Sequence, residues 1–178
     1  MVLEIHTEYD IPHLEELQRV LSAAVNPEAA KKSKKTYFLL GMVMMIAGVV
    51  LLMVSETPLV SSAIMAVLGI VCMERGVNFF KYAAKNIRRK MNRDFTGNDY
   101  ILDELGIRVE NVTGVLEFAY ADCDRLLETN QNIYIMLNDG QGLILDKTNV
   151  VGGTAEELRT WLEENCQKNL EKIDIKSK

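Results

Sequence analysis

The chain has 178 residues, of which 48% are apolar and 25% are charged, and its formal net charge is −5. This length suits one ordinary domain with additions and leaves too little chain for two full-sized domains. The glycine, cysteine and apolar contents exclude collagen-like, disulfide-scaffold and disordered proteins.

The first segment, residues 1–36, is expected to hold a short strand and an amphipathic helix. Residues 2–9 alternate imperfectly between apolar and polar side chains, which indicates an edge strand with one buried face. Asp10 can cap the helix that follows, with Pro12 in its first turn. Apolar residues at helical spacing form a stripe on this helix: Ile11, Leu14, Leu17, Leu21 and Ala24. The pair Asn26-Pro27 ends the helix and can begin the next one.

Residues 37–75 are predicted to form a transmembrane hairpin, with helices at about 37–55 and 58–75. Only one residue between positions 37 and 73 is charged. The first helix would be about 28 Å long, close to the ~30 Å thickness of the hydrocarbon core of a bilayer. The second run is less apolar, so it is expected to insert together with the first. A buried hairpin in a soluble core is the alternative, but the remaining chain is too short to cover two such apolar helices.

Basic residues flank the hairpin on both sides. They are Lys31, Lys32, Lys34 and Lys35 before it, and Arg75, Lys81, Lys85, Arg88, Arg89, Lys90 and Arg93 after it. Because Lys and Arg accumulate on the cytoplasmic side of membrane helices, both termini are expected in the cytoplasm. The sequence therefore predicts a multi-pass protein of the cytoplasmic membrane. Since 36 mostly polar residues precede the first apolar run, no cleavable signal peptide is expected.

Small residues recur on both membrane helices. They are Gly41, Gly48 and Ser55 in the first helix, and Ser62, Ala66 and Gly69 in the second. Small side chains let helix backbones approach closely in lipid. These positions predict a helix contact, either within the hairpin or with another membrane protein.

Residues 76–94 are predicted to form a basic juxtamembrane helix with an apolar stripe. Its basic side chains lie away from that stripe, and five are candidate contacts for anionic lipid headgroups: Lys81, Lys85, Arg88, Arg89 and Lys90. Each such residue contributes about 1 kcal/mol near an anionic surface. The alternative is that these charges only set the topology. Nucleic-acid binding is not expected, because residues 95–178 hold 16 acidic and 8 basic side chains and would repel phosphate.

Residues 95–168 are predicted to form a small domain of six strands and one closing helix. The strands are expected at 100–102, 106–110, 115–118, 125–129, 132–137 and 142–145. Asn138-Asp139-Gly140 indicates a tight hairpin, and Thr154 with Glu157 forms a capping box for the last helix. Residues 169–178 are expected to be a polar tail. The predicted fold is α+β: a two-helix membrane hairpin and a small antiparallel barrel or bent sheet with a C-terminal capping helix, which the N-terminal strand could complete.

No catalytic, metal or cofactor site is predicted, and no enzyme activity is expected. His6 and His13 are interpreted as ordinary surface or helix-start residues. Asp122-Cys123-Asp124 is interpreted as the cap of a short helix, since consecutive turn residues rarely converge on one metal ion. The three cysteines, Cys72, Cys123 and Cys166, are too far apart in sequence for a zinc or redox motif and are expected to be reduced.

Several short motifs resemble the YcxB-like family of bacterial membrane proteins. The motifs are Tyr120-Ala121-Asp122, Leu127-Glu128-Thr129, Ile133-Tyr134-Ile135, Asp146-Lys147 and Glu156-Glu157-Leu158-Arg159. Members of that family often carry Trp at the position of Tyr120 and Pro-Lys at the position of Asp146-Lys147. The resemblance implies a membrane hairpin, a pleckstrin-homology-like domain and a bacterial inner-membrane location. It implies no established activity, so no catalytic residue is transferred.

Together these features predict a non-catalytic binding or regulatory module that displays its acidic domain to a protein partner or to a second copy of the chain. One alternative is a sensor of anionic lipids, which would use the basic helix. Another is an accessory subunit of a larger membrane complex or transporter, suggested by the small-residue faces. An enzyme acting on a lipid or envelope precursor is the least favoured alternative, because the sequence lacks the polar cluster that catalysis would require.

Overall fold

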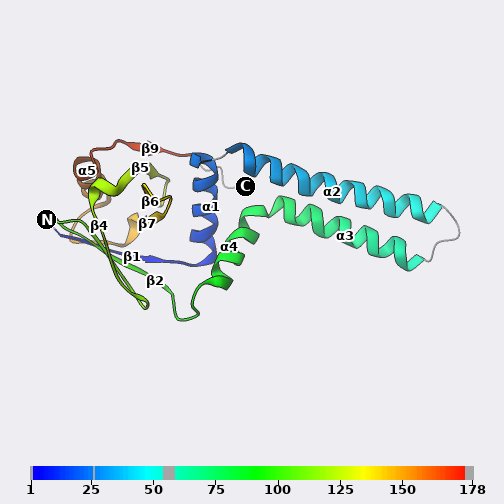
Figure 1. Ribbon diagram of the computed structural model, residues 1–178, viewed down its shortest axis with the longest axis horizontal. Coiled ribbons are helices and arrows are strands. Elements are labelled where there is room, and N and C mark those ends of the chain that lie inside the picture. The colour runs from blue at the N-terminus through cyan, green and yellow to red at the C-terminus, as the bar shows by residue number, and fades with distance from the viewer. Residues whose placement is uncertain (1, 26, 54–58, 175–178) are drawn as a thin grey trace. The chain divides into compact units, whose positions relative to one another are not determined.

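The computed structural model describes residues 2–25, 27–53 and 59–174 (Figure 1). Contacts divide the chain into two compact units. The sheet unit comprises Met1–Val20 and Ile87–Lys178, and the helix unit comprises Leu21–Asn86. Helices α1 (Ile11–Val25) and α4 (Phe79–Lys90) each begin in one unit and end in the other.

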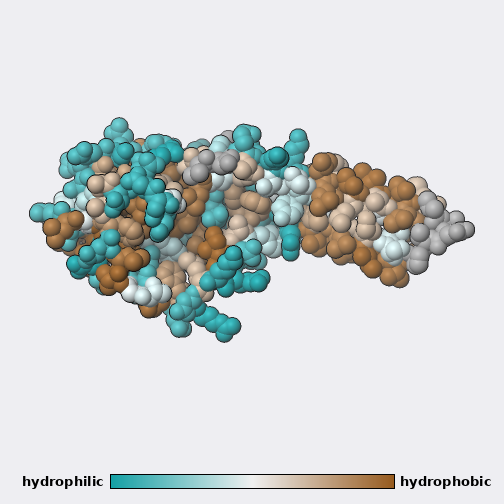
Figure 2. Space-filling model, in the orientation of Figure 1, coloured by the Kyte–Doolittle hydropathy of each residue, from teal (hydrophilic) through white to brown (hydrophobic). Residues whose placement is uncertain are grey.

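Two long helices make up most of the helix unit: α2 (Pro27–Met53) and α3 (Leu59–Val77). Both are long and apolar enough to cross a membrane, yet only 11% and 17% of their most apolar windows are buried inside the chain. A helix in a soluble core would bury most of that surface. Figure 2 shows hydrophobic side chains covering this part of the molecule. The two helices are therefore candidate membrane spans.

The small residues of the two helices pack within the hairpin, which is one of the two predicted alternatives. Gly41, Gly48, Ser62 and Gly69 are all buried. A Cβ atom on Gly41 would lie 2.6 Å from the carbonyl oxygen of Gly69, and a Cβ atom on Gly69 would lie 2.8 Å from that of Gly41. Such a close backbone approach requires glycine on both helices. Ser55 and the predicted turn lie outside the described residues.

The sheet unit is built from two sheets. Sheet A is antiparallel, in the order β4-β3-β2-β1-β8. Its strands are β1 (Leu3–Glu8), β2 (Gly97–Leu102), β3 (Ile107–Asn111), β4 (Gly114–Phe118) and β8 (Val150–Val151). Sheet B has the order β7-β6-β5-β9. Its strands are β5 (Cys123–Glu128), β6 (Asn132–Leu137), β7 (Gly142–Asp146) and β9 (Leu170–Lys172).

The N-terminal strand completes sheet A. Strand β1 pairs with β2 along its whole length, from Leu3 opposite Leu102 to Glu8 opposite Gly97. Its burial alternates between buried and exposed residues, which matches one face on the core and one in solvent. The helix unit is therefore inserted in sequence between two neighbouring strands of one sheet.

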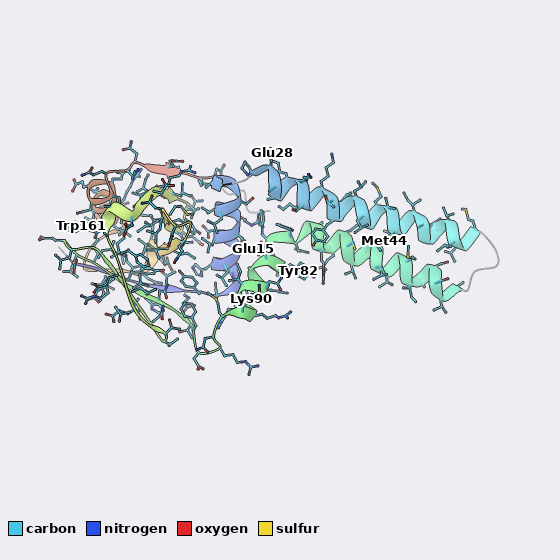
Figure 3. The ribbon with its side chains drawn as sticks, viewed as in Figure 1. Glu15, Glu28, Met44, Tyr82, Lys90 and Trp161 are labelled. Atoms are coloured by element: carbon cyan, nitrogen blue, oxygen red, sulfur yellow. The ribbon has the colours of Figure 1, made fainter. Side chains whose placement is uncertain are left out.

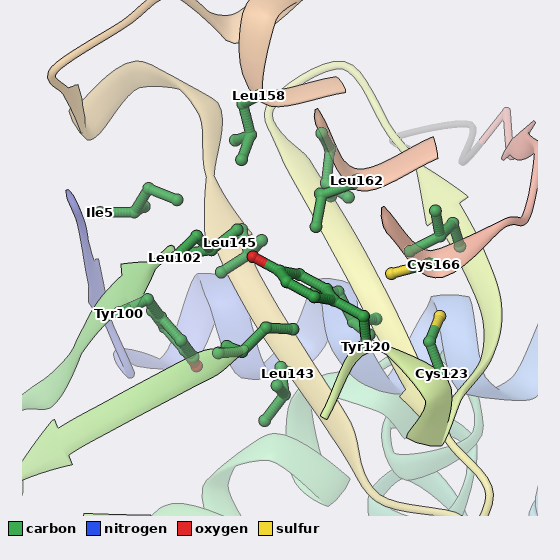
Figure 4. Packing of buried hydrophobic residues seen from close by; sticks show 14 of the residues in the cluster. Ile5, Tyr100, Leu102, Tyr120, Cys123, Leu143, Leu145, Leu158, Leu162 and Cys166 are labelled. Atoms are coloured by element: carbon green, nitrogen blue, oxygen red, sulfur yellow. The ribbon is translucent and has the colours of Figure 1, made fainter. Parts of the chain in front are cut away.

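Side chains from both sheets and from α5 (Ala155–Cys166) form one core. Figure 4 shows Leu102 of sheet A, Leu145 of sheet B, and Leu158 and Leu162 of α5 gathered near Tyr120. The Tyr120 hydroxyl accepts a hydrogen bond from Trp161 Nε1 at 2.8 Å. The same hydroxyl donates to the Asp103 carbonyl oxygen at 2.9 Å. Tyr120 therefore links the closing helix to the loop after β2.

Most local predictions for this unit are confirmed, but of Asp122-Cys123-Asp124 it is Asp122 that caps a short helix, by accepting from the Ala119 amide, whereas Cys123 and Asp124 lie in strand β5. The fold is α+β, and strands β2 to β7 correspond to the six predicted strands. The turn at Asn138-Asp139-Gly140 places Gly140 at a φ of 83°, which favours glycine. Helix α5 begins after Thr154, whose side chain accepts from the Glu157 amide, while the Glu157 carboxylate accepts from the Thr154 amide.

Two expectations about the sheet unit need correction. Sheet B is mixed, because β9 pairs parallel with β5, and the two sheets do not close into a barrel. The prediction of a polar tail from residue 169 was wrong for the first part of this segment, because Leu170–Lys172 form strand β9. Leu170 is buried in the core, Arg125 and Glu171 form an ion pair at 2.6 Å, and Ile173 donates its amide to the Glu128 carbonyl at 2.8 Å. Leu170 is the one apolar residue of β9, so the sequence lacks the alternation that would have predicted a strand here.

Candidate functional site

The five predicted lipid contacts lie on α4. Lys81, Lys85, Arg89 and Lys90 are exposed, and Arg88 is half-buried and donates to the Asn92 carbonyl oxygen at 3.2 Å. The exposed side chains give α4 a concentrated positive charge. This arrangement is available to anionic headgroups and also agrees with a role in setting topology.

Aromatic residues organise charges beside this helix. Tyr82, labelled in Figure 3, donates its hydroxyl to the Glu74 carboxylate at 2.6 Å. That bond to a carboxylate is the main reason why the pKa of Tyr82 is raised. Lys85 Nζ lies 5.6 Å from the centre of the Tyr82 ring, and Lys34 Nζ lies 4.1 Å from the centre of the Phe80 ring. Both lysines therefore make cation–π contacts.

An ionic cluster forms where three of the family-like motifs meet in space. Lys147 Nζ lies 3.0 Å from Glu128 Oε1 and donates to the Thr129 carbonyl oxygen at 2.7 Å. An Arg159 guanidinium nitrogen lies 3.8 Å from Glu128 Oε2. The Glu128 and Lys147 side chains are only 12% and 15% exposed, so neither charge is well solvated without its partner. Motifs that are distant in sequence thus meet in one ionic cluster.

A second polar cluster joins α1 to sheet B. The Glu16 carboxylate accepts hydrogen bonds from the Thr129 hydroxyl and, at 3.0 Å, from Asn132 Nδ2. The Tyr134 hydroxyl is buried and has no hydrogen-bond partner among the described residues. Burial, followed by the nearby Glu16 charge, raises the pKa of Tyr134 well above its ordinary value. Tyr134 is therefore kept neutral, and the cluster fastens the first turns of α1 to β6.

The two histidines occupy separate places, and each has a carboxylate partner. His6 Nδ1 lies 2.6 Å from Asp99 Oδ1 on the exposed face of sheet A. His13 Nδ1 lies 2.7 Å from Asp10 Oδ1, and its Nε2 lies 3.9 Å from Asp146 Oδ2. Asp10 also caps α1, because it accepts from the His13 amide at 2.9 Å. The hydrogen bonds of His13 therefore go to Asp10, and the Asp146 carboxylate lies farther away.

Two cysteines that the sequence separates by more than forty residues meet in the core. Cys123 begins β5 and Cys166 ends α5, and Figure 4 shows their sulfur atoms facing each other. A hydrogen bond between the thiols lowers the pKa of Cys123 and raises that of Cys166. Both side chains are buried. Sequence spacing did not predict this pair, and within the described residues no cluster of His, Cys, Asp and Glu is arranged to hold a metal ion.

The edge strand β4 exposes consecutive apolar side chains. All four residues Gly114–Glu117 are exposed, and Val115 and Leu116 are 57% and 54% exposed. The other edge strands expose less backbone for pairing: β8 has two residues, β9 has three, and four of the five β7 residues are buried. An exposed edge strand presents unpaired backbone groups that can pair with another chain. Strand β4 is therefore the best candidate for a docking surface in this unit.

A pocket of about 260 Å³ lies at the C-terminal end of β4. Its lining residues are Asp103, Leu105, Gly106, Ile107, Arg108, Glu117, Phe118 and Ala119. Leu105, one of these residues, is 90% exposed. Sequence reasoning missed this surface, because an alternating strand gives no sign of whether its apolar side will be covered.

No protein-family model, curated protein or solved structure matches the chain. The resemblance to the YcxB-like family therefore stays a prediction based on the short motifs.

Proposed function

We propose that the protein is a non-catalytic binding module anchored in the bacterial cytoplasmic membrane. Helices α2 and α3 span the bilayer as a hairpin, both termini lie in the cytoplasm, and the sheet unit binds a protein partner there. The apolar, little-buried surfaces of α2 and α3 support the membrane location. The basic residues on both flanks support the orientation. The partly buried ion pair of Glu128 with Lys147 fits a structural role in a binding module better than a catalytic role.

The observation that carries this proposal is the exposed apolar edge of β4. Strand addition to such an edge is a recurrent way of binding an extended segment, because backbone hydrogen bonds supply affinity and side chains supply specificity. In a soluble, monomeric protein the same edge would invite aggregation. Membrane anchoring restricts the encounters of this edge to molecules at the membrane surface.

Photo-crosslinking in cells tests the proposal. A photoreactive amino acid is placed at Val115 or Leu116 of the full-length protein, with Val151 as the matched control. Val151 is a suitable control because it is 62% exposed and lies on the opposite edge of the same sheet. We expect a discrete crosslinked protein from β4 and none from Val151. Equal crosslinking at the two edges would contradict a docking role for β4.

Topology has its own test. Reporter fusions at each terminus are expected to show cytoplasmic activity, and a periplasmic signal from either terminus would overturn the hairpin orientation.

A second candidate function, sensing of anionic lipids, is favoured by the four exposed basic residues of α4. Native mass spectrometry of the full-length protein would count the anionic lipids that remain bound. Replacing Lys81, Lys85, Arg89 and Lys90 by Gln should remove most of them, whereas replacing the exposed Lys168 and Lys172 should not. Unchanged lipid retention in the α4 variant would exclude this function.

The accessory-subunit alternative loses its sequence motivation. The small residues that suggested it, including Gly41 and Gly69, are already used inside the hairpin.

A further inference from the structure

The register of sheet A shows which side of β4 lacks a cover. Ile5, Tyr100, Val109 and Leu116 are direct cross-strand neighbours, so their side chains lie on one face of the sheet. The first three are 2%, 0% and 2% exposed, and Leu116 is 54% exposed. Leu116 therefore lies on the core-facing side of the sheet, but no other element covers it among the described residues. A strand paired with β4 would place its own side chains beside Leu116 on this face.

The opposite face of β4 is acidic. Val115 and Glu117 share this face with their cross-strand partners Glu110 and Arg108. Between residues 103 and 119 there are four carboxylates and one basic residue: Asp103, Glu104, Glu110, Glu117 and Arg108. Arg108 Nε already lies 3.3 Å from Glu117 Oε1. The surroundings of the edge therefore favour a cationic partner and disfavour an anionic one.

These two faces define the chemistry of an occupant, because side chains of a strand alternate between faces. We propose, on the basis of the binding function above, that β4 pairs with an extended peptide segment of a partner protein in which basic and apolar residues alternate. Its apolar residues cover Leu116 and Phe118, and its basic residues lie over Glu117 and Glu110. One terminal side chain enters the pocket between Leu105 and Ala119. Antiparallel pairing continues the pattern of sheet A.

A binding measurement with defined peptides tests this chemistry. The probe is a fluorescent eight-residue peptide of alternating Lys and Val, titrated onto the full-length protein in nanodiscs of zwitterionic lipid. One control peptide alternates Glu and Val, and a second has the probe's composition arranged as a Lys block followed by a Val block. We expect the alternating Lys-Val peptide to bind at least about tenfold more tightly than either control. Equal binding of the block peptide would show unspecific charge attraction and overturn the proposal.

Variants locate the binding to β4. Leu116→Lys should weaken the alternating peptide about tenfold, whereas Val151→Lys on the opposite edge should leave its affinity unchanged. The double variant Glu110→Lys and Glu117→Lys should reverse the preference toward the Glu-Val peptide. All of these side chains are at least partly exposed, so the variants are expected to fold, and an unchanged melting temperature verifies this. An affinity for the alternating peptide that Leu116→Lys leaves unchanged would overturn the assignment to β4.

The crosslinking experiment separates this inference from the function on which it rests. If Val115 and Leu116 crosslink a partner but the protein shows no preference for the Lys-Val peptide, the partner chemistry is wrong and the docking function stands. If these positions crosslink only a second copy of the chain, the peptide proposal is overturned in favour of self-association. If neither position crosslinks anything, the docking function fails as well.

Discussion

The helix unit and the sheet unit bury opposite kinds of residue. In the helix unit the large apolar side chains point outward and glycines fill the contact between helices, as at Gly41 and Gly69. In the sheet unit the large apolar side chains point inward, and even charged groups such as Glu128 and Lys147 are partly buried. The comparison teaches that α2 and α3 keep the apolar exposure of candidate membrane helices, whereas the sheet unit buries most of its large apolar side chains. Lipid rewards close backbone packing, whereas water rewards removal of apolar area.

The largest expected effect tests the sheet unit's dependence on buried apolar volume. Leu126 is 0% exposed, so Leu126→Ala should lower the free energy of unfolding by about 2–5 kcal/mol through lost burial and a cavity. Urea unfolding followed by fluorescence of Trp161, the only tryptophan, reports on this unit alone. The control Val115→Ala removes an exposed side chain and should stay within about 0.5 kcal/mol. Equal losses for the two variants would contradict the burial pattern.

The helix unit should be most sensitive to added volume. Gly41→Ile places a branched side chain where even a Cβ atom would lie 2.5 Å from Met73 Cγ, so we expect a loss of about 3 kcal/mol in hairpin stability. Protease resistance of the full-length protein in nanodiscs measures the effect. Val43→Ile, at an exposed position of the same helix, should behave like the wild type. A tolerated Gly41→Ile would show that the helices do not meet at this face.

The ionic cluster tests whether the sheet unit needs its buried charges to be paired. Among the described residues, Lys147→Met leaves the more distant Arg159 as the ion-pair partner of the Glu128 carboxylate, and should cost about 2 kcal/mol. The double variant Lys147→Met and Glu128→Met should regain part of this loss, because no buried charge is then left unpaired. Lys168→Met, at an exposed lysine, is the control. A double variant that is less stable than the single one would indicate that the pair itself is strongly stabilising.

The smallest effect concerns pH and strand β9. Arg125 hydrogen-bonds to Glu171 and holds the pKa of that carboxyl below its ordinary value. Because the pKa of Glu171 is lowered in the folded protein, its ion pair stabilises the fold at pH values above the ordinary pKa of a glutamate. This stabilisation is lost as the pH falls through the lowered pKa of Glu171. Because Glu171 is 53% exposed, solvent screening limits the contribution to a few tenths of a kcal/mol.

Hydrogen exchange of the Ile173 amide measures this effect, because that N–H donates a hydrogen bond to the Glu128 carbonyl oxygen. At pH 7 the wild type should exchange more slowly than Glu171→Gln, and the difference should vanish under acid conditions. A difference between the two proteins that persists at low pH would rule out the Glu171 carboxylate as its source.

The sequence predicted those elements whose conformation depends on interactions within a few neighbouring residues. The capping box at Thr154 and Glu157, the Asp139-Gly140 turn and the alternation within each of the six strands predicted their elements, because the stabilising groups lie within a few residues. The length of the uncharged runs likewise predicted the two apolar helices.

Contacts between distant segments were not predictable from the sequence. The pairing of β1 with β2, the parallel docking of β9 and the meeting of Cys123 with Cys166 each join residues separated by more than forty positions. The candidate docking surface belongs to the same class. The sequence does not show which of two paired strands is covered: Val109 of β3 is buried, and its cross-strand partner Leu116 of β4 is not.

The sequence by itself thus determined the two apolar helices, the charge that flanks them and the type of each local element. These depend on hydrophobicity and on hydrogen bonds within a few residues. Only the tertiary structure decided which strands are neighbours and which edge is left uncovered. Coverage is a property of the whole assembly of elements, because a side chain is buried only if some other part of the chain reaches it.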